Sequence, residues 1–535
     1  MSDNNYNTIV VGGGIAGLTA AVYQARAGRK VLLIEKNEVC GGLVNTFSSD
    51  GFRFDAGVRA LLDAGIILTM LKDLKIDLDT VKSHVSLGIG NDIINIDSIE
   101  SLKTYADLLK KHFPQNSEEI DHLIKVIRKI MHHMDVLYGI ENPVFKDLKR
   151  DLPFVFRKIL PWFPRFLVTV RKINKMKAPV ETYLEGFISN PALRDIIAQH
   201  FFKNTPSFFA LSYFSLYLDY FYPSGGVGKL SDALTQKVIL FGGEIKTRTL
   251  VTSLDPASRS VIDADGNTYH YEQLIWAADL KRLYTMSNTK NLPPAHREKM
   301  AAMTSKLLQH RGGDSVFTLF LQVNLPAETF GNIAHGHFFY TPSDKGLGEV
   351  HRTELDQLLE KFPEVSQEEV LTWLDRYIGL NTFEISIPAL KDPSMAPEGK
   401  TGMIVSLLAE YELFKKIQEA GWLKEFTLAF ETKMIQVLND SVYPMLRDHL
   451  IGQFSFTPLS IEQRVGSSEG GITGWAFGES MPVIDKIQIA DRSVNTPIPH
   501  VYQAGQWVYS PGGVPMSILT GKLASDKVLK KKVER

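Results

Sequence analysis

Residues 8–17 constrain the fold of this chain more than any other segment. A β-branched apolar run typical of a buried strand is followed at once by the pattern Gly12-x-Gly14-x-x-Gly17. Good helix-forming residues continue from there. The sequence therefore predicts a strand, a tight turn and a helix, which together form a dinucleotide-binding unit.

Each glycine of this pattern has its own physical role. Gly12 permits the sharp turn, Gly14 lets the backbone approach a pyrophosphate, and Gly17 allows close packing of helix on strand. The N–H groups of the first helical turn, near Ile15 and Ala16, are free to bind an anion. The alternative is a structural glycine turn in an unrelated α/β unit.

A carboxylate stands where a ribose-binding acid is expected. Residues 30–34 are typical of a second buried strand, and Glu35 follows it, about 20 residues beyond the glycines. We expect Glu35, with Lys36 beside it, to contact the ribose of an adenosine.

Two further turns suggest that the chain passes the same ligand again. Gly41 and Gly42 precede Leu43, and an Asp55-x-Gly57 turn follows a predicted short hairpin. Glycines at these places would suit a long ligand such as FAD, although a plain hairpin explains them as well.

Composition sets wider limits. A length of 535 residues allows about two to four domains. The net charge of −1 gives no general signal for nucleic acid. The single cysteine, Cys40, excludes an intramolecular disulfide and favours a reducing compartment. The first residues lack a signal-peptide pattern, and the apolar window at 206–222 is short and contains Asp219, so we expect a cytoplasmic protein without a transmembrane helix.

The pattern becomes helical between residues 59 and 221. Residues 151–178 hold seven Lys or Arg against one Asp, interleaved with aromatic residues. Such a segment can lie at the surface of an anionic bilayer, where each cation contributes about 1 kcal/mol, or it can be an ordinary solvated helix pair. The aromatic-rich residues 201–222 are either core or the lining of an apolar tunnel.

The α/β character returns at residue 222 and again near the C-terminus, separated by a second insertion. The predicted fold is a three-layer, discontinuous Rossmann-like domain of residues 1–60, 222–280 and 455–535. A helical lid with the candidate membrane segment covers 61–221, and an α+β substrate domain covers 281–454.

Several motifs along the chain are typical of one family. They are the fingerprint with Glu35, Gly41-Gly42, Phe54-Asp-Ala-Gly57, Tyr222-Pro-Ser-Gly-Gly-Val-Gly228, the stretch 387–400, Thr457-Pro458, Gly505 and Pro511-Gly-Gly-Val-Pro515. Over nearly its whole length the chain resembles the FAD-dependent phytoene desaturase, carotenoid isomerase and retinol saturase family.

This resemblance implies an FAD-dependent oxidoreductase acting on carbon–carbon double bonds of a long apolar polyene or isoprenoid. Desaturation, saturation or isomerisation would exchange a hydride with flavin N5. The resemblance also places the C-terminal helix against the flavin. The predicted cofactor-binding residues are Gly12, Gly14, Ile15, Ala16, Gly17, Glu35, Lys36, Gly41, Gly42, Leu43, Gly57, Val58, Arg59, Val251, Gly505, Gln506, Gly513, Val514 and Pro515.

Two positions depart from related patterns. Leu43 stands where many amine oxidases carry an arginine, which argues against that branch. Gln506 stands where an acidic residue commonly follows the glycine. A flavin amine oxidase-like enzyme on a small apolar substrate, or a non-catalytic flavin-binding carrier of lipid or pigment, stays open. The substrate and the electron donor or acceptor are not determined by the sequence.

No acid–base pair is evident, and Arg59 is a catalytic candidate, with a surface ion pair as its alternative. His335 and His337 have no Cys or carboxylate partner at ligand spacing, so no metal site is predicted. Residues 466–470 match the Gly-x-Ser-x-Gly pattern of a nucleophile elbow, and we attribute this match to chance. A second glycine fingerprint is missing, so we expect no separate NAD(P) domain. Cys40 is interpreted as a packing residue rather than a covalent flavin link.

Overall fold

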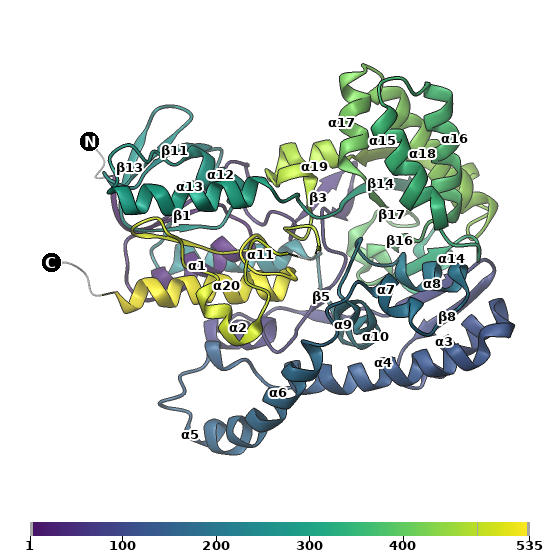
Figure 1. Cartoon of the computed structure of the whole chain (residues 1–535), viewed down its shortest axis with the longest axis horizontal. Coiled ribbons are helices and arrows are strands. Elements are labelled where there is room, and N and C mark those ends of the chain that lie inside the picture. Colours follow the sequence, from purple (N-terminus) through teal and green to yellow (C-terminus); the bar gives the residue numbers. More distant parts are fainter. Residues whose placement is uncertain (1–3, 479, 532–535) are drawn as a thin grey trace.

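The computed structural model describes residues 4–478 and 480–531. Two seven-stranded sheets organise this part of the chain. In Figure 1 the first sheet and both termini lie on the left, and the second sheet with its helices lies on the right.

The first sheet is the Rossmann-like one. Five of its strands run parallel to their neighbours in the order β10, β2, β1, β13, β19, and two more, β12 and β11, continue from β13 as an antiparallel edge. The strands are β1 (Asn5–Val11), β2 (Val31–Ile34), β10 (Glu244–Lys246), β11 (Val251–Asp255), β12 (Ser260–Asp263), β13 (Thr268–Trp276) and β19 (Val501–Gln503).

Both faces of this sheet are covered, as the alternation along β1 shows. Val10 packs into a core with α1, α11 and α20, whereas Ile9 and Val11 pack into a second core with α12 and α13. The predicted three-layer α/β fold is therefore confirmed. These helices are α1 (Ile15–Arg26), α11 (Gly228–Leu240), α12 (Leu280–Met286), α13 (Pro294–Leu308) and α20 (Val514–Lys530).

The second sheet buries one face under helices and turns the other toward the first sheet's domain. Its order is β18, β14, β17, β16, β15, β7, β8. The strands are β7 (Val85–Ile89), β8 (Asp92–Ile96), β14 (Ser315–Val323), β15 (His337–Thr341), β16 (Phe383–Ser386), β17 (Thr401–Ala409) and β18 (Leu450–Phe456). The covering helices are α14 (Ala327–Gly331), α15 (Leu355–Lys361), α16 (Gln367–Leu380), α17 (Tyr411–Glu419) and α18 (Leu423–Asp440).

The region 61–221 is less purely helical than the sequence predicted. Its strands β7 and β8 extend the second sheet, and β5 (Leu61–Leu62), β6 (Thr80–Lys82) and β9 (Tyr220–Pro223) form a small sheet. These strands are short, whereas α4 is long and has a clear helical periodicity. The helical pattern therefore dominated the prediction for this region. Its helices are α2 (Ile67–Leu74), α3 (Ser101–His112), α4 (Ser117–Tyr138), α5 (Leu152–Phe154), the π-helical η3 (Val155–Ile159), α6 (Leu160–Ile173), α7 (Val180–Glu185), α8 (Pro191–Ala198), α9 (Ser207–Leu211) and α10 (Tyr213–Asp219).

Helices α17 and α18 are separated by a turn in which Gly421 adopts φ +83°. The division into three domains stays a prediction.

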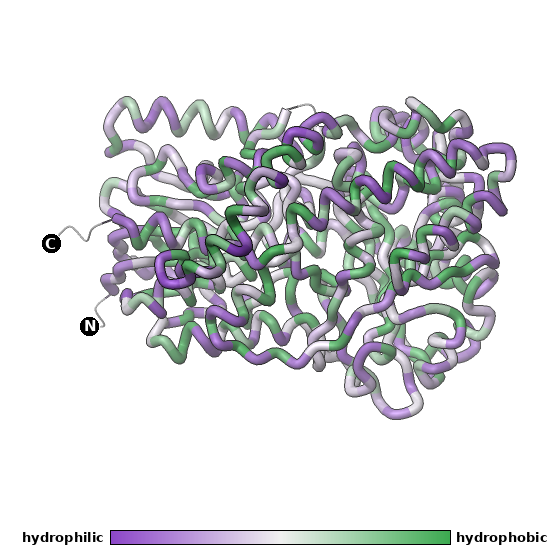
Figure 2. The backbone as a smooth tube through the Cα atoms, turned by 90° about the horizontal axis from the view of Figure 1, so that it is seen from below, coloured by the Kyte–Doolittle hydropathy of each residue, from purple (hydrophilic) through white to green (hydrophobic). Residues whose placement is uncertain are grey.

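Nowhere in residues 4–478 and 480–531 is a helix both long enough and apolar enough to cross a membrane. Figure 2 views the molecule from the side on which α5 and α6 project, and hydrophobic and hydrophilic positions alternate along the helices seen there.

Candidate functional site

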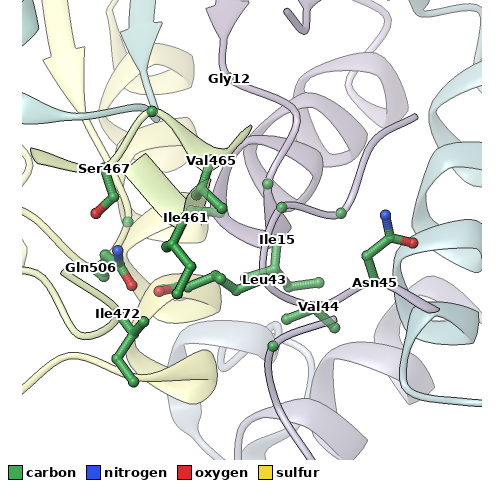
Figure 3. A pocket seen from close by; sticks show the side chains of 18 of the residues that line it. Gly12, Ile15, Leu43, Val44, Asn45, Ile461, Val465, Ser467, Ile472 and Gln506 are labelled. Atoms are coloured by element: carbon green, nitrogen blue, oxygen red, sulfur yellow. The ribbon is translucent and has the colours of Figure 1, made fainter. Parts of the chain in front are cut away.

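One cavity of about 1200 Å³ lies between the two sheets. Its lining combines the N-terminal glycine turns, the C-terminal segment 504–517, the segment 460–473 and one face of the second sheet. Figure 3 shows Ile15 and Leu43 on one side and Ile461, Ile472 and Gln506 on the other. Both ends of the chain therefore contribute to a single site.

Two helices begin at this cavity without a side-chain cap. Gly14 is the N-cap of α1, and a Cβ added there would meet no atom within 4 Å. Gly513 is the N-cap of α20, adopts φ +123°, and is equally open. Free N–H groups and two helix dipoles therefore favour negative charge at two places in one cavity.

The remaining fingerprint glycines are required by packing. A Cβ on Gly12 would lie 2.7 Å from the carbonyl oxygen of Ala277, and Gly12 also adopts φ +103°. A Cβ on Gly17 would lie 1.9 Å from the carbonyl oxygen of Gly12. Helix α1 can approach the strand turn only because both side chains are absent.

Most predicted cofactor-binding residues line the cavity, but Gly17 and Pro515 do not. Gly17 acts in packing, and Pro515 stands in the first turn of α20 behind Gly513 and Val514. The cofactor contacts of the others stay predictions. Those lining the cavity are Gly12, Gly14, Ile15, Ala16, Glu35, Lys36, Gly41, Gly42, Leu43, Gly57, Val58, Arg59, Val251, Gly505, Gln506, Gly513 and Val514.

Glu35 lies at the end of β2 on the cavity wall and is 7% exposed. Its carboxylate accepts hydrogen bonds from the backbone N–H of Gly13 at 2.7 Å and of Asn37 at 2.8 Å. These bonds fix the carboxylate beside the glycine turn, and its binding of a ribose stays a prediction.

Cys40 does not line the cavity. Burial and the nearby Glu35 carboxylate raise the pKa of its thiol to about 12, so the thiol stays protonated at neutral pH. A Cβ on Gly13 would lie 2.8 Å from its sulfur. These contacts support the packing interpretation.

Three of the motifs that carry the family resemblance, residues 54–57, 222–228 and 387–400, meet in one junction. Asp55 is completely buried and accepts hydrogen bonds from the hydroxyl of Tyr222 at 2.6 Å, the N–H of Val227 at 3.0 Å and the hydroxyl of Thr46 at 2.8 Å. Asp392 likewise accepts from the N–H of Gly225 at 2.5 Å. The junction joins the β3–β4 hairpin (Thr46–Ser49, Phe52–Asp55) to the turn that starts α11.

A row of polar side chains crosses the cavity face of the second sheet. Thr318 pairs with Ser406 across β14 and β17, and Ser406 pairs with Glu384 across β17 and β16. His337, on β15, lies diagonally from Glu384. All four line the cavity, while the alternate residues of the same strands pack into the core under the helices.

Arg59 joins this row and is 4% exposed, so the alternative of a surface ion pair is wrong. Its Nη1 donates to the carbonyl oxygen of Asp55 at 2.6 Å, and its Nη2 donates to Ser406 Oγ at 3.0 Å. Arg59 therefore links the glycine-turn side of the cavity to the sheet face.

Both histidines of the His335-Gly-His337 pattern have carboxylate partners, which corrects the sequence interpretation. His337 Nε2 lies 3.0 Å from Glu384, inside the cavity, and His335 Nε2 lies 3.3 Å from Asp97 in an exposed ion-pair cluster with His84. Glu384 and Asp97 lie far from the two histidines in the sequence and come close to them only in the folded chain, so no motif spacing could have predicted these pairs. The predicted absence of a metal stays a prediction.

Burial and nearby charges determine the protonation states of His337 and Glu384. Burial lowers the pKa of His337 more than its bond to Glu384 raises it. Burial alone would raise the pKa of Glu384, but the bond from His337 and the cations Arg59 and Lys391 outweigh burial and lower it. A neutral imidazole therefore faces a carboxylate.

Sequence reasoning missed most of the wall opposite the glycine turns. The segment 460–473 carried one usable signal, its glycine-rich turn, but this turn was considered only as a nucleophile elbow. From the aromatic block, four side chains line the cavity and others enter the core, so the core interpretation holds for part of the block and the apolar tunnel stays a prediction. The four are Phe202, Phe209, Tyr213 and Tyr220.

Comparisons with known proteins agree with this geometry. Residues 10–74 match the family described as NAD(P)-binding Rossmann-like domain. A putrescine oxidase structure with bound putrescine superposes with a TM-score of 0.59 at 14% identity, covering 98% of this chain and 99% of the other. The fold is thus a Rossmann-like dinucleotide-binding fold of the amine-oxidase type.

Several curated proteins are similar to this chain over nearly its whole length. The chain is 22% identical to an all-trans-retinol 13,14-reductase of Danio rerio, over 98% of this chain and 86% of the relative. It is 24% identical to a 4,4'-diapolycopene oxygenase of Methylomonas sp, over 99% of each. A Danio rerio protein named as an inactive all-trans-retinol 13,14-reductase is 22% identical over 95% of this chain and 83% of its own length. Over nearly its whole length the chain is therefore similar to proteins of the carotenoid desaturase and retinol saturase family.

Proposed function

We propose that this protein is an FAD-dependent oxidoreductase that changes carbon–carbon double bonds in a long apolar polyene or isoprenoid. The observation that carries the proposal is the shared cavity. Its volume of about 1200 Å³ exceeds the range of about 300–1,000 Å³ for a pocket that holds one small ligand. Such a space suits a cofactor and a substrate together.

The residues of the glycine side fit FAD. The open backbone at Gly14 and the uncapped start of α1 would hold the pyrophosphate, and Glu35 would bind the ribose. The uncapped start of α20 would favour negative charge on the flavin ring. When bound, FAD supplies a carrier of hydride to or from a substrate carbon.

The residues of the other side would orient an apolar chain and exclude water. Phe202, Phe209 and Tyr213 line one part of the cavity, and Phe456 and Phe477 line others. The apolar area of these rings favours a hydrocarbon over a small polar amine. Leu43, in place of the arginine of many amine oxidases, agrees with this preference.

Anaerobic incubation of the FAD-loaded protein with carotenoids and retinoids tests the proposal. We expect a product with altered double bonds, together with a change in flavin absorbance when the reaction is not redox-neutral. A purified protein that neither contains nor takes up FAD would overturn the cofactor assignment.

A non-catalytic flavin-binding carrier is the second candidate, favoured by the relative that is named inactive. A carrier would retain a polyene without changing it under every redox condition. An amine oxidase would instead release peroxide from a small amine. Product analysis with a peroxide assay on the same protein sample separates all three functions.

We also propose peripheral contact with an anionic membrane through residues 151–178. Five apolar residues spaced three or four apart share one exposed face of α5, η3 and α6, with Phe156 64% and Leu160 54% exposed. Exposed cations stand on the same helices. This combination supports binding at the lipid headgroup level. The apolar residues are Leu152, Phe156, Leu160, Phe163 and Leu167.

Flotation with vesicles containing phosphatidylserine tests this contact. We expect F156S/L160S/F163S to abolish flotation, and neutralising Arg157, Lys158, Arg171 and Lys172 to reduce it. A matched control is I239S/L240S on α11, which removes two side chains that are 59% and 70% exposed elsewhere. Equal flotation of all variants would contradict the proposal.

A further inference from the structure

The cavity contains a carboxylate–imidazole pair with one ring nitrogen left over. His337 Nε2 and Glu384 Oε1 lie 3.0 Å apart, and the His337 side chain is 3% exposed. An ionised Glu384 accepts a hydrogen bond, so Nε2 carries the ring proton and Nδ1 holds a lone pair. Nδ1 is buried and has no hydrogen-bond partner among residues 4–478 and 480–531.

The imidazole cannot easily rotate to change this arrangement. Its ring stacks on Tyr220 with centroids 5.5 Å apart and planes at 16°, and Phe339 packs against it at 5.0 Å. The strand pairing of β15 with β16 fixes the position of Glu384 relative to the ring. Buried polar atoms are normally paired in folded proteins, and His337 is a cavity-lining residue whose Nδ1 lacks such a partner.

Nearby cations stabilise the negative charge of Glu384 in the His337–Glu384 pair. Arg59 and Lys391 are the cations that act on Glu384, and Lys391 also donates to Ser386 Oγ at 3.0 Å. Burial keeps the hydroxyls of Tyr220 and Tyr213 protonated, because it raises the pKa of both. A proton gained by Nδ1 would create an imidazolium held directly against the Glu384 carboxylate.

We infer that His337 is the acid–base catalyst of this cavity and that Glu384 is its positioning residue, an assignment that rests on the proposed function. In a desaturation, one hydrogen would leave a substrate carbon as a hydride, and FAD held by the glycine turns would supply its acceptor. The adjacent carbon gives its proton to Nδ1, and the electron pair of that C–H bond becomes the new double bond. In a saturation Nδ1–H would donate the proton to one carbon, and reduced FAD, when bound, would supply the hydride for the other.

Nitrogen-15 NMR of histidine-labelled protein tests the tautomer without turnover. We expect His337 to be neutral with the proton on Nε2, and E384Q to shift both ring nitrogen resonances. H337Q identifies the signals by their loss. A proton on Nδ1 in the wild-type protein would overturn the inference.

Anaerobic flavin redox kinetics with a polyene that the wild type converts test the chemical role. We expect H337Q to slow the reaction at least about 100-fold. E384Q should lower the rate less and shift its pH profile. H335Q is the matched control, because His335 is two residues away and lies outside the cavity lining. Circular dichroism and FAD titration establish that each variant folds and binds flavin.

The outcomes separate the two claims. A wild type that binds FAD yet converts no polyene overturns the proposed function, and the catalytic role with it. An active wild type with H337Q retaining its rate and pH profile overturns the catalytic role alone.

Discussion

The first sheet meets the cavity with the ends of its strands, whereas the second sheet meets it with one of its faces. Gly12 follows β1, Glu35 follows β2 and Gly505 follows β19, all at the carboxyl edge of parallel strands. Thr318, Ser406, Glu384 and His337 instead stand on four neighbouring strands.

This difference has a chemical consequence. Strand ends lead into turns and helix N-termini, which offer backbone N–H groups and suit the phosphates of a cofactor. A sheet face offers side chains at fixed cross-strand spacing, which suits the placement of acid, base and cation around a substrate. We therefore expect substitutions on the first side to affect cofactor binding and those on the second to affect chemistry. The following experiments test this division.

The largest effect is expected at the junction that joins the two sides. Asp55→Ala leaves the Tyr222 hydroxyl, the Val227 N–H and the Thr46 hydroxyl without their acceptor in a buried place. At about 1–3 kcal/mol for each buried unsatisfied group, we expect the free energy of unfolding to fall by about 4 kcal/mol. Urea denaturation measures this loss.

The control for this junction is Asp265→Ala, at an exposed turn of the first sheet. A change within about 0.5 kcal/mol is expected there. A loss below about 1 kcal/mol at Asp55 would show that the two sides are not joined by this network.

The next effect concerns the strand-end side alone. Gly14→Glu adds a side chain where no atom lies within 4 Å, so the fold should tolerate it. Its negative charge would stand at the predicted pyrophosphate site, and we expect FAD affinity to fall at least about 100-fold, or about 2.8 kcal/mol. Flavin fluorescence titration measures the affinity. Gly379→Glu, also at an open position, should leave it unchanged; equal affinity of both variants would refute the site.

The two sides also differed in how well the sequence predicted them. The fingerprint, Glu35 and the start of α20 are local patterns of turn and helix formation, so their positions along the chain were predictable. The polar row on the second sheet brings residues 318, 337, 384 and 406 together through strand pairing, and Arg59 reaches it through a hydrogen bond to Ser406; both depend on tertiary contacts. The helical prediction for 61–221 missed the strands of that region for the same reason, because β7 is a strand by its pairing with β15.

A pH effect is expected on the sheet-face side. Burial lowers the pKa of Lys391 to about 8, from an ordinary value of 10.5. Between these values the unfolded chain binds a proton that the folded chain does not, so stability should rise with pH. Relative to Lys391→Met, we expect the wild type to gain about 1–2 kcal/mol between pH 8 and pH 10.

Urea denaturation of both proteins at several pH values gives this difference. Lys424→Met, at an exposed position on α18, should follow the wild type throughout. If the difference between wild type and Lys391→Met stays constant with pH, Lys391 titrates at its ordinary pKa and its surroundings are wetter than the contacts indicate.

The smallest effect is expected within the polar row. Ser406 Oγ lies 3.0 Å from Arg59 Nη2 and 3.1 Å from Thr318 Oγ1, so Ser406→Ala removes two hydrogen bonds at once. We expect a loss of about 1 kcal/mol in the free energy of unfolding, because Arg59 keeps its bond to the Asp55 carbonyl. In a double-mutant cycle with Thr318→Ala, the two substitutions should cost less together than the sum of their separate effects, since both break the same contact.

FAD affinity should stay unchanged in all three variants, because the row belongs to the substrate side. A change in FAD affinity equal to that of Gly14→Glu would show that one network serves both sides and that strand ends and sheet face do not divide the work.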